Sequence, residues 1–301
     1  YTKTFDLTSQ ISSDRAITPG STLSYRLLYN ATGSGKAELR DAAAMENKSQ
    51  PVHRWVPWIA GYSWQFVEDA IEAYLPIARR SQALVLDPFA GTGSTAKAAI
   101  PLGRKAICVD QNPQYVELIE GACRKLHNGH APGFNPLEVI HGDSRRLTSI
   151  GDESVGLVVT SPPYWDKADY GPGADNLGAI EIYTQFIEAT ADVWRECYRV
   201  LMPGRKLCLV TANVNQHTDM GLLTFPLATD FAVLLRKLGF VMINEIIWSK
   251  DGTGGRWGSA NAQRPIFGSY PYPPNFLFKN VHEYILIFAK PGLVKTKGPK
   301  V

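Results

Sequence analysis

The residue types best suited to chemistry lie in TSPPYW, residues 160–165, which follows an apolar run typical of a buried strand. Two consecutive prolines end the hydrogen bonding of a strand and hold the backbone extended. They leave the Ser161 hydroxyl, the carbonyl oxygens of Pro162 and Pro163 and the Tyr164 ring at the strand tip. Hydrogen-bond acceptors can hold the protons of an amine on a planar ring and align its nitrogen with an electrophile. An aromatic side chain can stack on that ring. We therefore predict these four residues as the catalytic group, with a plain proline turn as the alternative.

A glycine-rich turn, LDPFAGTGST at residues 86–95, joins another apolar run to a helical segment. Glycines let the backbone approach a ligand closely, and the free amides at the start of a helix can bind it. The turn predicts a nucleotide-like cofactor, and a tight strand–helix turn without a ligand is the alternative. A phosphate-binding loop is excluded because no Gly-Lys-Ser/Thr follows the turn.

Asp110 ends the next apolar run, KAICVD at residues 105–110. Nucleotide-binding α/β folds present a carboxylate at this place to ribose hydroxyls, and the carboxylate accepts both protons in charge-assisted hydrogen bonds. This spacing by itself fits a dinucleotide as well as S-adenosyl-L-methionine.

The elements that must position these residues are strands and helices in alternation. Apolar runs predict strands at 83–87, 105–110, 138–143, 156–163, 206–213, 243–249 and 281–289. Three- and four-residue spacing of apolar side chains predicts helices that begin near 94, 113, 180 and 226. Such alternation implies an α/β, doubly wound sheet whose ligand lies at the carboxyl ends of parallel strands. The last two strands enclose only a loop, 250–280, which predicts a closing antiparallel pair.

The composition is that of an ordinary globular protein, with 45% apolar and 20% charged residues. No apolar run is long enough to span a membrane, so no membrane partner is expected. A formal net charge of +3 permits a polyanionic partner without requiring one. The four cysteines are scattered without a Cys-x-x-Cys pair, which indicates buried thiols and an intracellular setting, cytoplasm or nucleoid. His127 and His130 have no third ligand at a spacing typical of metal sites, so no metal site is predicted.

Four segments resemble motifs of the amino-methyltransferases of DNA. DPFAGTGST resembles their motif I, VDQNP their second motif and HGDS their third, and HRWVPWIAGYSWQFVEDAI, residues 53–71, resembles their motif X. The likeness covers residues 53–290, most of the chain. It implies a mostly parallel, seven-stranded Rossmann-like methyltransferase sheet and S-adenosyl-L-methionine as the cofactor.

The same resemblance gives roles to residues of these motifs. It implies that Asp87, Phe89, Gly91 and Gly93 line the methionine and sulfonium side. It also implies that Asp110 binds the ribose and that the acid of the third motif binds the adenine. The predicted cofactor-binding set is Asp87, Pro88, Phe89, Ala90, Gly91, Gly93, Asp110, Gln111, Asp143, Ser144 and Ser161.

The likeness continues beyond the Ser-Pro-Pro-Tyr segment, where 169–187, 199–210, 243–250 and 273–290 resemble N4-cytosine and some N6-adenine enzymes. These enzymes transfer a methyl group to the exocyclic amine of a flipped base. Serine at the head of the motif favours cytosine N4, because the adenine enzymes usually carry Asp or Asn there; adenine N6 is the alternative. An RNA base methyltransferase and a non-catalytic nucleic-acid-binding partner are further alternatives. The absence of an RNA-binding module in 1–50 and the intact motifs count against them.

Two departures from the family bear on DNA recognition. The cofactor motifs precede the catalytic motif, and only a basic tail, 291–301, follows the last predicted strand of the 51–290 methyltransferase domain. The irregular extension 1–50 and the inserts 165–180 and 250–280 are therefore expected to recognise the DNA sequence. Arginines interleaved with aromatic residues suit phosphate contact and base stacking, whereas an apolar flap over the sheet is the alternative for 250–280. The predicted DNA-binding residues are Trp165, Arg256, Trp257, Arg264 and Tyr270.

Overall fold

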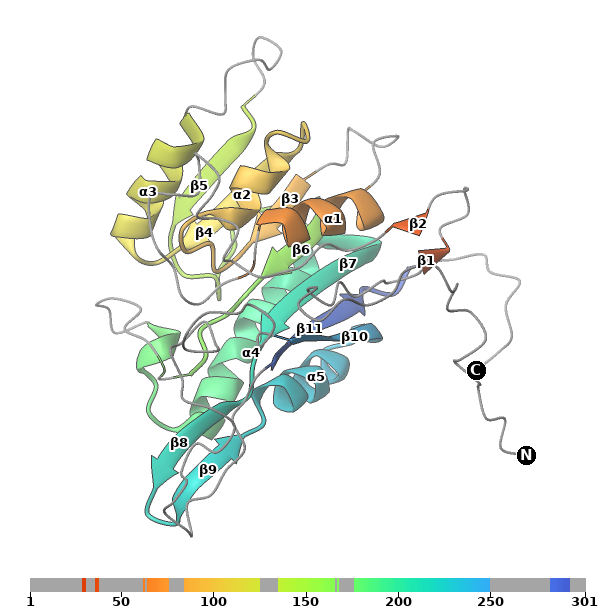
Figure 1. The fold of residues 1–301 in the computed structure, drawn as a ribbon. Coiled ribbons are helices and arrows are strands. Elements are labelled where there is room, and N and C mark those ends of the chain that lie inside the picture. Colours follow the sequence, from red (N-terminus) through yellow and green to blue (C-terminus); the bar gives the residue numbers. More distant parts are fainter. Residues whose placement is uncertain are drawn as a thin grey trace, which may run out of the picture.

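A seven-stranded sheet forms the centre of the molecule in the computed structural model (Figure 1). The structure describes residues 62, 64–75, 84–124, 135–165, 167, 176–249 and 282–292, with the strand backbones of 29–30 and 36–37. The strands of the sheet are β3 Leu84–Asp87, β4 Lys105–Asp110, β5 Leu137–His141, β6 Val155–Thr160, β7 Leu201–Thr211, β10 Val241–Ser249 and β11 His282–Ala289.

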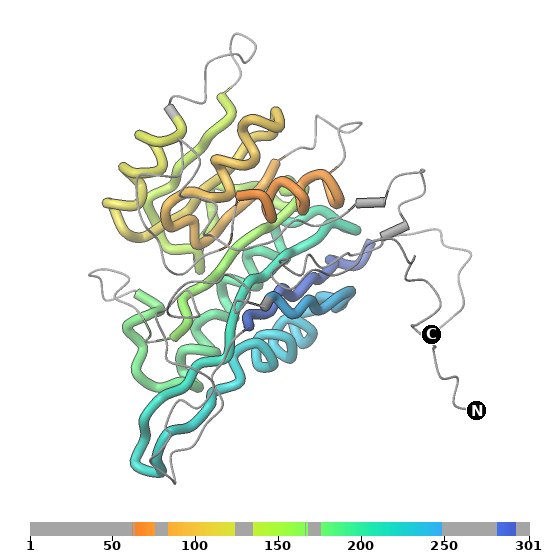
Figure 2. The backbone as a smooth tube through the Cα atoms, viewed as in Figure 1, coloured from red at the N-terminus to blue at the C-terminus, as the bar shows by residue number. Residues whose placement is uncertain are grey.

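The strand order is β10-β11-β7-β6-β3-β4-β5. Strands β5, β4, β3, β6 and β7 run parallel to one another, whereas β11 pairs antiparallel with both β7 and β10. Figure 2 shows the chain building one half of the sheet before it crosses to the other. The order reverses between β3 and β6, and this is where a doubly wound sheet binds its ligand. The predicted parallel sheet and its closing antiparallel pair are confirmed.

Helices cover both faces of the sheet. They are α1 Trp64–Tyr74, α2 Ser94–Ala99, α3 Pro113–Arg124, α4 Tyr183–Val200 and α5 Leu227–Lys237. The first three pack on one face, where Phe66, Ala96 and Ile119 share a core cluster, and the last two on the other, around Trp194 and Phe231 (Figure 1). Every residue of β6 is buried, as expected for a central parallel strand covered on both sides.

Several boundaries differ from the sequence expectation. Strand β5 ends at His141, so Asp143 lies just beyond the strand and not at its last residue. Strand β7 begins earlier than predicted, at Leu201, where it pairs with Val155 of β6. Further along, Gly204 N–H donates to Lys290 O and Lys290 N–H donates to Arg205 O. These hydrogen bonds extend the pairing with the end of β11.

Two pairs of strands lie outside the main sheet and were not predicted. Strands β8 Val214–Thr218 and β9 Gly221–Phe225 form an antiparallel hairpin after β7. Strands β1 Tyr29–Asn30 and β2 Lys36–Ala37 pair antiparallel within the extension that was expected to be irregular. No helix among the described residues is long and apolar enough to cross a membrane.

Candidate active site

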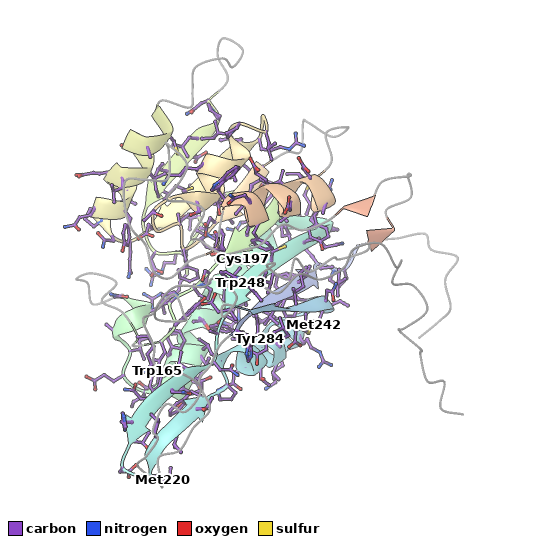
Figure 3. The ribbon with its side chains drawn as sticks, viewed as in Figure 1. Trp165, Cys197, Met220, Met242, Trp248 and Tyr284 are labelled. Carbon is purple, nitrogen blue, oxygen red and sulfur yellow. The ribbon has the colours of Figure 1, made fainter. Side chains whose placement is uncertain are left out.

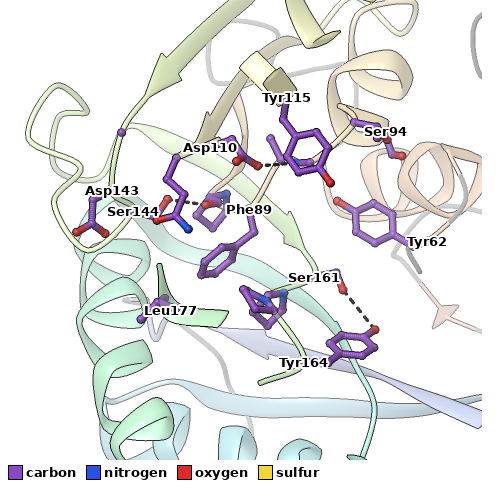
Figure 4. A pocket seen from close by; sticks show the side chains of 18 residues that line it. Tyr62, Phe89, Ser94, Asp110, Tyr115, Asp143, Ser144, Ser161, Tyr164 and Leu177 are labelled. Atoms are coloured by element: carbon purple, nitrogen blue, oxygen red, sulfur yellow. Dashed lines mark hydrogen bonds between the residues drawn. The ribbon is translucent and has the colours of Figure 1, made fainter. Parts of the chain in front are cut away.

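One pocket opens at the carboxyl ends of β3, β4, β5 and β6, on both sides of the point where the strand order reverses (Figure 4). Its empty space amounts to about 1000 Å³ when the part open to solvent is included. Its walls come from the strand–helix turns after β3 and β4, from the loop after β5 and from the tip of β6, and Tyr62 and Leu177 complete them. The lining residues are Tyr62, Pro88, Phe89, Ala90, Gly91, Thr92, Ser94, Asp110, Gln111, Tyr115, Gly142, Asp143, Ser144, Ser161, Pro162, Pro163, Tyr164 and Leu177.

The glycine turn between β3 and α2 depends on backbone conformations that favour glycine. Gly91 and Gly93 have φ angles of 50° and 82°. A Cβ atom at Gly93 would lie 3.0 Å from Cγ1 of Ile119, so this glycine also lets α3 pack closely against the turn. Gly91 lines the pocket and Gly93 does not. The two predicted cofactor-binding glycines therefore differ in position, since only the first faces the pocket.

Asp87 lies beneath the glycine turn and holds it in place. Its side chain is 1% exposed and is absent from the pocket lining. Its carboxylate accepts hydrogen bonds from the hydroxyls of Tyr62 at 2.7 Å, Thr95 at 2.7 Å and Thr160 at 2.8 Å, and from the backbone N–H of Phe89 at 3.1 Å. Burial raises the pKa of this carboxyl, while these hydrogen bonds lower it in part. Asp87, which was predicted to contact the cofactor, therefore lies one layer below the pocket. Its carboxylate links β3 to the end of β6 through Thr160.

Asp110, unlike Asp87, lines the pocket. One oxygen accepts the backbone N–H of Gly91 at 2.8 Å and the other accepts that of Asn112 at 2.9 Å. Burial raises the pKa of this carboxyl, and the two backbone hydrogen bonds act against that rise. A carboxylate has about four lone-pair sites, so both oxygens retain capacity for the hydroxyls of a ribose. Gln111, the next residue, also lines the pocket, as predicted for this wall.

Asp143 and Ser144 lie where the chain leaves β5. Arg145 binds the Asp143 carboxylate through Nη2 at 2.8 Å, and its backbone N–H donates to the same carboxylate at 2.9 Å. Ser144 Oγ donates to the carbonyl oxygen of Pro88 at 2.5 Å. The third predicted cofactor motif is thereby fixed to the first, and both residues line the same pocket.

The tip of β6 places the four predicted catalytic residues on the opposite wall of the pocket. Pro162 and Pro163 are buried, while Ser161 and Tyr164 are half-buried. The two hydroxyls face each other, and Ser161 Oγ donates to Tyr164 Oη at 3.3 Å (Figure 4). Because that bond uses the only hydroxyl proton of Ser161, the lone pairs of its oxygen are left to accept from a ligand.

Trp165 does not lie where a DNA contact was predicted. Its side chain is 5% exposed, and its indole N–H donates to the carbonyl oxygen of Ile180 at 2.8 Å. The ring packs against Tyr183 and Phe225 with centroid distances of 5.2 and 4.8 Å. Trp165 therefore supports the strand tip from the core, because burying the indole removes it from any DNA surface. The other predicted DNA contacts, Arg256, Trp257, Arg264 and Tyr270, lie outside the described residues.

Six lining residues were not predicted as part of the site: Tyr62, Thr92, Ser94, Tyr115, Gly142 and Leu177. Thr92 and Ser94 lie within the segment that resembles motif I, and Gly142 lies within the segment that resembles the third motif. Tyr62 lies in the segment that resembles motif X, and this was the available signal for it. The helical pattern of α3 gave no indication that Tyr115 faces a pocket. Leu177 lies in a short 3-10 turn, Leu177–Ala179, for which the sequence has no periodic pattern. Among the described residues, no three His, Cys, Asp or Glu side chains gather closely enough to hold a metal ion.

These features define a class of protein: a doubly wound α/β protein whose glycine turn and Ser-Pro-Pro-Tyr strand tip share one pocket at the carboxyl ends of the strands. A family model described as DNA methylase, for N6 and N4 methyltransferases, matches residues 41–121 and 155–298. This match covers more than half of the chain, and the protein belongs to the DNA methylase family.

The chain is also similar to individual proteins of this kind. It is 31% identical over 186 residues to Type II methyltransferase M.MjaI of Methanocaldococcus jannaschii, covering 54% of this chain and 59% of that relative. It is 28% identical over 162 residues to M.MthZI of Methanothermobacter thermautotrophicus, covering 50% of this chain and 43% of that relative. The chain therefore spans about half the length of the curated relatives it matches.

A solved structure is similar over a comparable length. TTHA0409 of Thermus thermophilus, described as a DNA modification methylase and complexed with S-adenosyl-L-methionine, is 38% identical. The alignment covers 52% of this chain and 54% of that chain, with a TM-score of 0.37.

Proposed function

We propose that this protein is an S-adenosyl-L-methionine-dependent methyltransferase that modifies the exocyclic amine of a flipped base in DNA, with cytosine N4 as the target. The observation that carries the proposal is that Asp110 and the strand tip Ser161–Tyr164 line one pocket. Membership of the DNA methylase family supports the reaction and the substrate. The Type II methyltransferase relatives and the cofactor-bound TTHA0409 support them as well.

The pocket residues fit this cofactor. Asp110 offers carboxylate oxygens to the ribose hydroxyls, and the pocket continues along Pro88 and Phe89 toward the tip of β6. Asp143 lies on the same wall and offers acceptors to the adenine amine, with Arg145 limiting its net negative charge. The bound cofactor supplies a methyl group that its sulfonium centre has already made electrophilic. A covalent nucleophile from the protein is therefore unnecessary.

The residues at the strand tip hold and orient the exocyclic amine of the base, which is a poor nucleophile. The lone pair of a ring amine is delocalised into the base, so the reaction depends on acceptors that fix the amine protons and aim the nitrogen. Ser161 Oγ accepts one proton while its own proton points to Tyr164, and the carbonyl oxygen of Pro162 accepts the other. The Tyr164 ring offers a face on which an extruded base can stack. The two prolines keep these groups rigid, so that little reorganisation is needed in the transition state.

The choice of cytosine N4 depends on Ser161. Cytosine and adenine present similar amidine-like amines, so the same acceptors can hold either one. The resemblance to N4-cytosine enzymes, which carry serine at this position, favours cytosine. Adenine N6 is the second candidate, because the family model includes both activities.

Nucleoside mass spectrometry tests the reaction directly. Unmethylated DNA incubated with the protein and methyl-labelled S-adenosyl-L-methionine is digested to nucleosides, and matched RNA serves as the control. We expect label in N4-methylcytosine from the DNA alone. Label in N6-methyladenine would change the target base and keep the mechanism. Label confined to RNA would refute the proposed substrate.

A further inference from the structure

The β8–β9 hairpin leaves the sheet from the same edge as the catalytic strand tip. Strand β7 is parallel to β6, with Leu209 paired to Thr160, so both strands end at the carboxyl edge. The chain continues from β7 at Thr211 into β8 at Val214. The hairpin then projects away from the sheet (Figure 1). An element that starts beside the reacting groups and extends beyond them is well placed to contact a large substrate.

The base of the hairpin is fixed to the catalytic segment. Phe225 packs against Trp165 and Tyr183, with centroid distances of 4.8 and 4.9 Å. Val214, which pairs with Phe225, is 5% exposed. Trp165 directly follows Tyr164 in the chain, and Figure 3 places it at the base of the hairpin. The hairpin therefore holds a defined position relative to the pocket.

The outer part of the hairpin is polar but almost uncharged. In residues 214–225, VNQHTDMGLLTF, the only fully charged side chain is Asp219. The register pairs Asn215 with Thr224 and His217 with Leu222, which puts these four side chains on one face. His217 and Thr224 are exposed. Neutral hydrogen-bonding groups suit the edges of bases, whereas phosphates are usually bound by Arg and Lys.

The tip of the hairpin carries an apolar side chain in solvent. Met220 is 78% exposed and lies at the far end of the hairpin (Figure 3). It is the most exposed of the large hydrophobic side chains in the described part of the chain. Apolar side chains that DNA-binding proteins present in this way insert between base steps and help to unstack them. A two-stranded ribbon also has the width that the major groove of DNA admits.

We infer that the β8–β9 hairpin is a DNA-reading arm that enters a groove beside the target base, with His217 facing base edges and Met220 wedged at the tip. This inference rests on the proposed function, since it identifies how the same site engages its DNA. The strands extend about 15 Å from their base, enough to reach base pairs that flank the flipped one. The arm adds a recognition element to the inserts that the sequence indicated.

Two surface variants and one matched control test the arm. The variants are Met220→Ser and His217→Ala, and the control is Val241→Ser, a 54% exposed apolar residue. Val241 is the first residue of β10 and pairs with Ala289, which pairs with Lys206. Because Lys206 pairs with Leu157 near the start of β6, the control lies at the amino edge of the sheet, opposite the strand tip. Each full-length protein methylates unmodified plasmid DNA with labelled S-adenosyl-L-methionine. The readouts are KM for DNA, KM for the cofactor, and the sequence around each methylated base.

If the hairpin contacts DNA in this way, both variants should raise KM for DNA about tenfold. They should also widen the set of methylated sequences, since each lost base contact reduces the discrimination between base pairs. KM for the cofactor stays within about twofold of the parent value, because the arm has no residue in the pocket lining. The control should match the parent in all three readouts. Circular dichroism melting confirms that each variant is folded before its kinetics are compared.

Other outcomes separate this inference from the proposed function. If the parent labels DNA and both variants retain its KM for DNA and its sequence pattern, the arm is refuted and amino-methylation stands. If the parent labels no DNA, both proposals fail. If the variants dissociate a dimer in light scattering without a change in KM for DNA, the tip docks a second copy of the chain and the arm is again refuted.

Discussion

At the scale of single residues, two carboxylates of similar sequence context have different positions. Asp87 and Asp110 each end a strand, and the resemblance gives both to the cofactor. The structure separates them, because Asp87 binds three hydroxyls in the core and Asp110 binds two backbone N–H groups at the pocket wall. The sequence could not separate them, since burial depends on which helix covers each strand end.

Replacing Asp110 should weaken the binding of the cofactor. In Asp110→Ala the ribose hydroxyls lose their charged acceptor, and we expect S-adenosyl-L-methionine binding to weaken by about 1.5–3 kcal/mol. Burial raises the pKa of Asp110, so affinity in the parent should fall as the pH decreases through that raised pKa. The variant should lack this decrease. Calorimetric titration measures both effects, and unchanged affinity in the variant would exclude Asp110 from the site.

Replacing Asp87 should destabilise the fold. In Asp87→Ala the hydroxyls of Tyr62, Thr95 and Thr160 lose a shared acceptor within the core. Each buried polar group without a partner costs about 1–3 kcal/mol, but the hydroxyls of Tyr62 and Thr95 lie 2.6 Å apart and can bond each other, so we expect a loss of about 3 kcal/mol. Urea unfolding gives the free energy of unfolding. Asp110→Ala is the control and should lose less, because its carboxylate is partly exposed.

Replacing Ser161 should reduce turnover without affecting the cofactor. In Ser161→Ala one acceptor for the amine is lost, and we expect kcat to fall by about two orders of magnitude because positioning acts mainly on the transition state. Cofactor affinity should remain close to that of the parent, which calorimetry can check. A variant with full activity in a labelled-methyl transfer assay would contradict the amine-holding mechanism.

At the scale of secondary-structure elements, the central strands β3 and β6 were predictable because each is an apolar run that ends in a polar residue. β6 is buried at every position, and its sequence VGLVVT has no polar residue before Thr160. The β8–β9 hairpin was not predictable in this way, because VNQHTDMGLLTF has no regular alternation of apolar and polar residues. Its position depends on packing between Phe225 and Trp165, which lie far apart in the sequence.

The loop 250–280 should contribute to the affinity for DNA and not to the affinity for the cofactor. Arg256 and Arg264 lie outside the described residues, so their predicted role depends on the sequence pattern alone. If each contacts a phosphate, Arg256→Ala and Arg264→Ala should weaken DNA binding and each reduce the salt slope by about 1. Fluorescence anisotropy across a salt titration measures this. Parent-like binding in both variants would favour the alternative of a structural flap.

At the scale of the whole molecule, the pocket lies between the two halves of the sheet. One half is β3-β4-β5 and the other is β6-β7-β11-β10. Asp87 on β3 binds Thr160 on β6 across this boundary, whereas Ser144 beyond β5 binds the turn after β3 within the first half. The hydrogen bond across the boundary lies directly beneath the glycine turn and the strand tip that line the pocket. A ligand in the pocket contacts both halves and should therefore stabilise them as one unit.

This coupling predicts how the cofactor affects unfolding. A ligand that binds only the folded state stabilises it by RT ln(1 + [L]/Kd), about 2.7 kcal/mol at one hundred times Kd. With S-adenosyl-L-methionine at that excess, we expect a single unfolding transition to shift as a whole, as followed by calorimetry and by tryptophan fluorescence. Trp194 lies on α4 and packs against Phe231 of α5 and against Phe89 of the turn after β3, so its contribution to the fluorescence depends on both halves. Asp110→Ala should reduce the shift at the same ligand concentration, because its binding is weaker. Two separate transitions, of which only the β3-β4-β5 half responds to the cofactor, would show that the halves unfold independently and that the ligand does not join them.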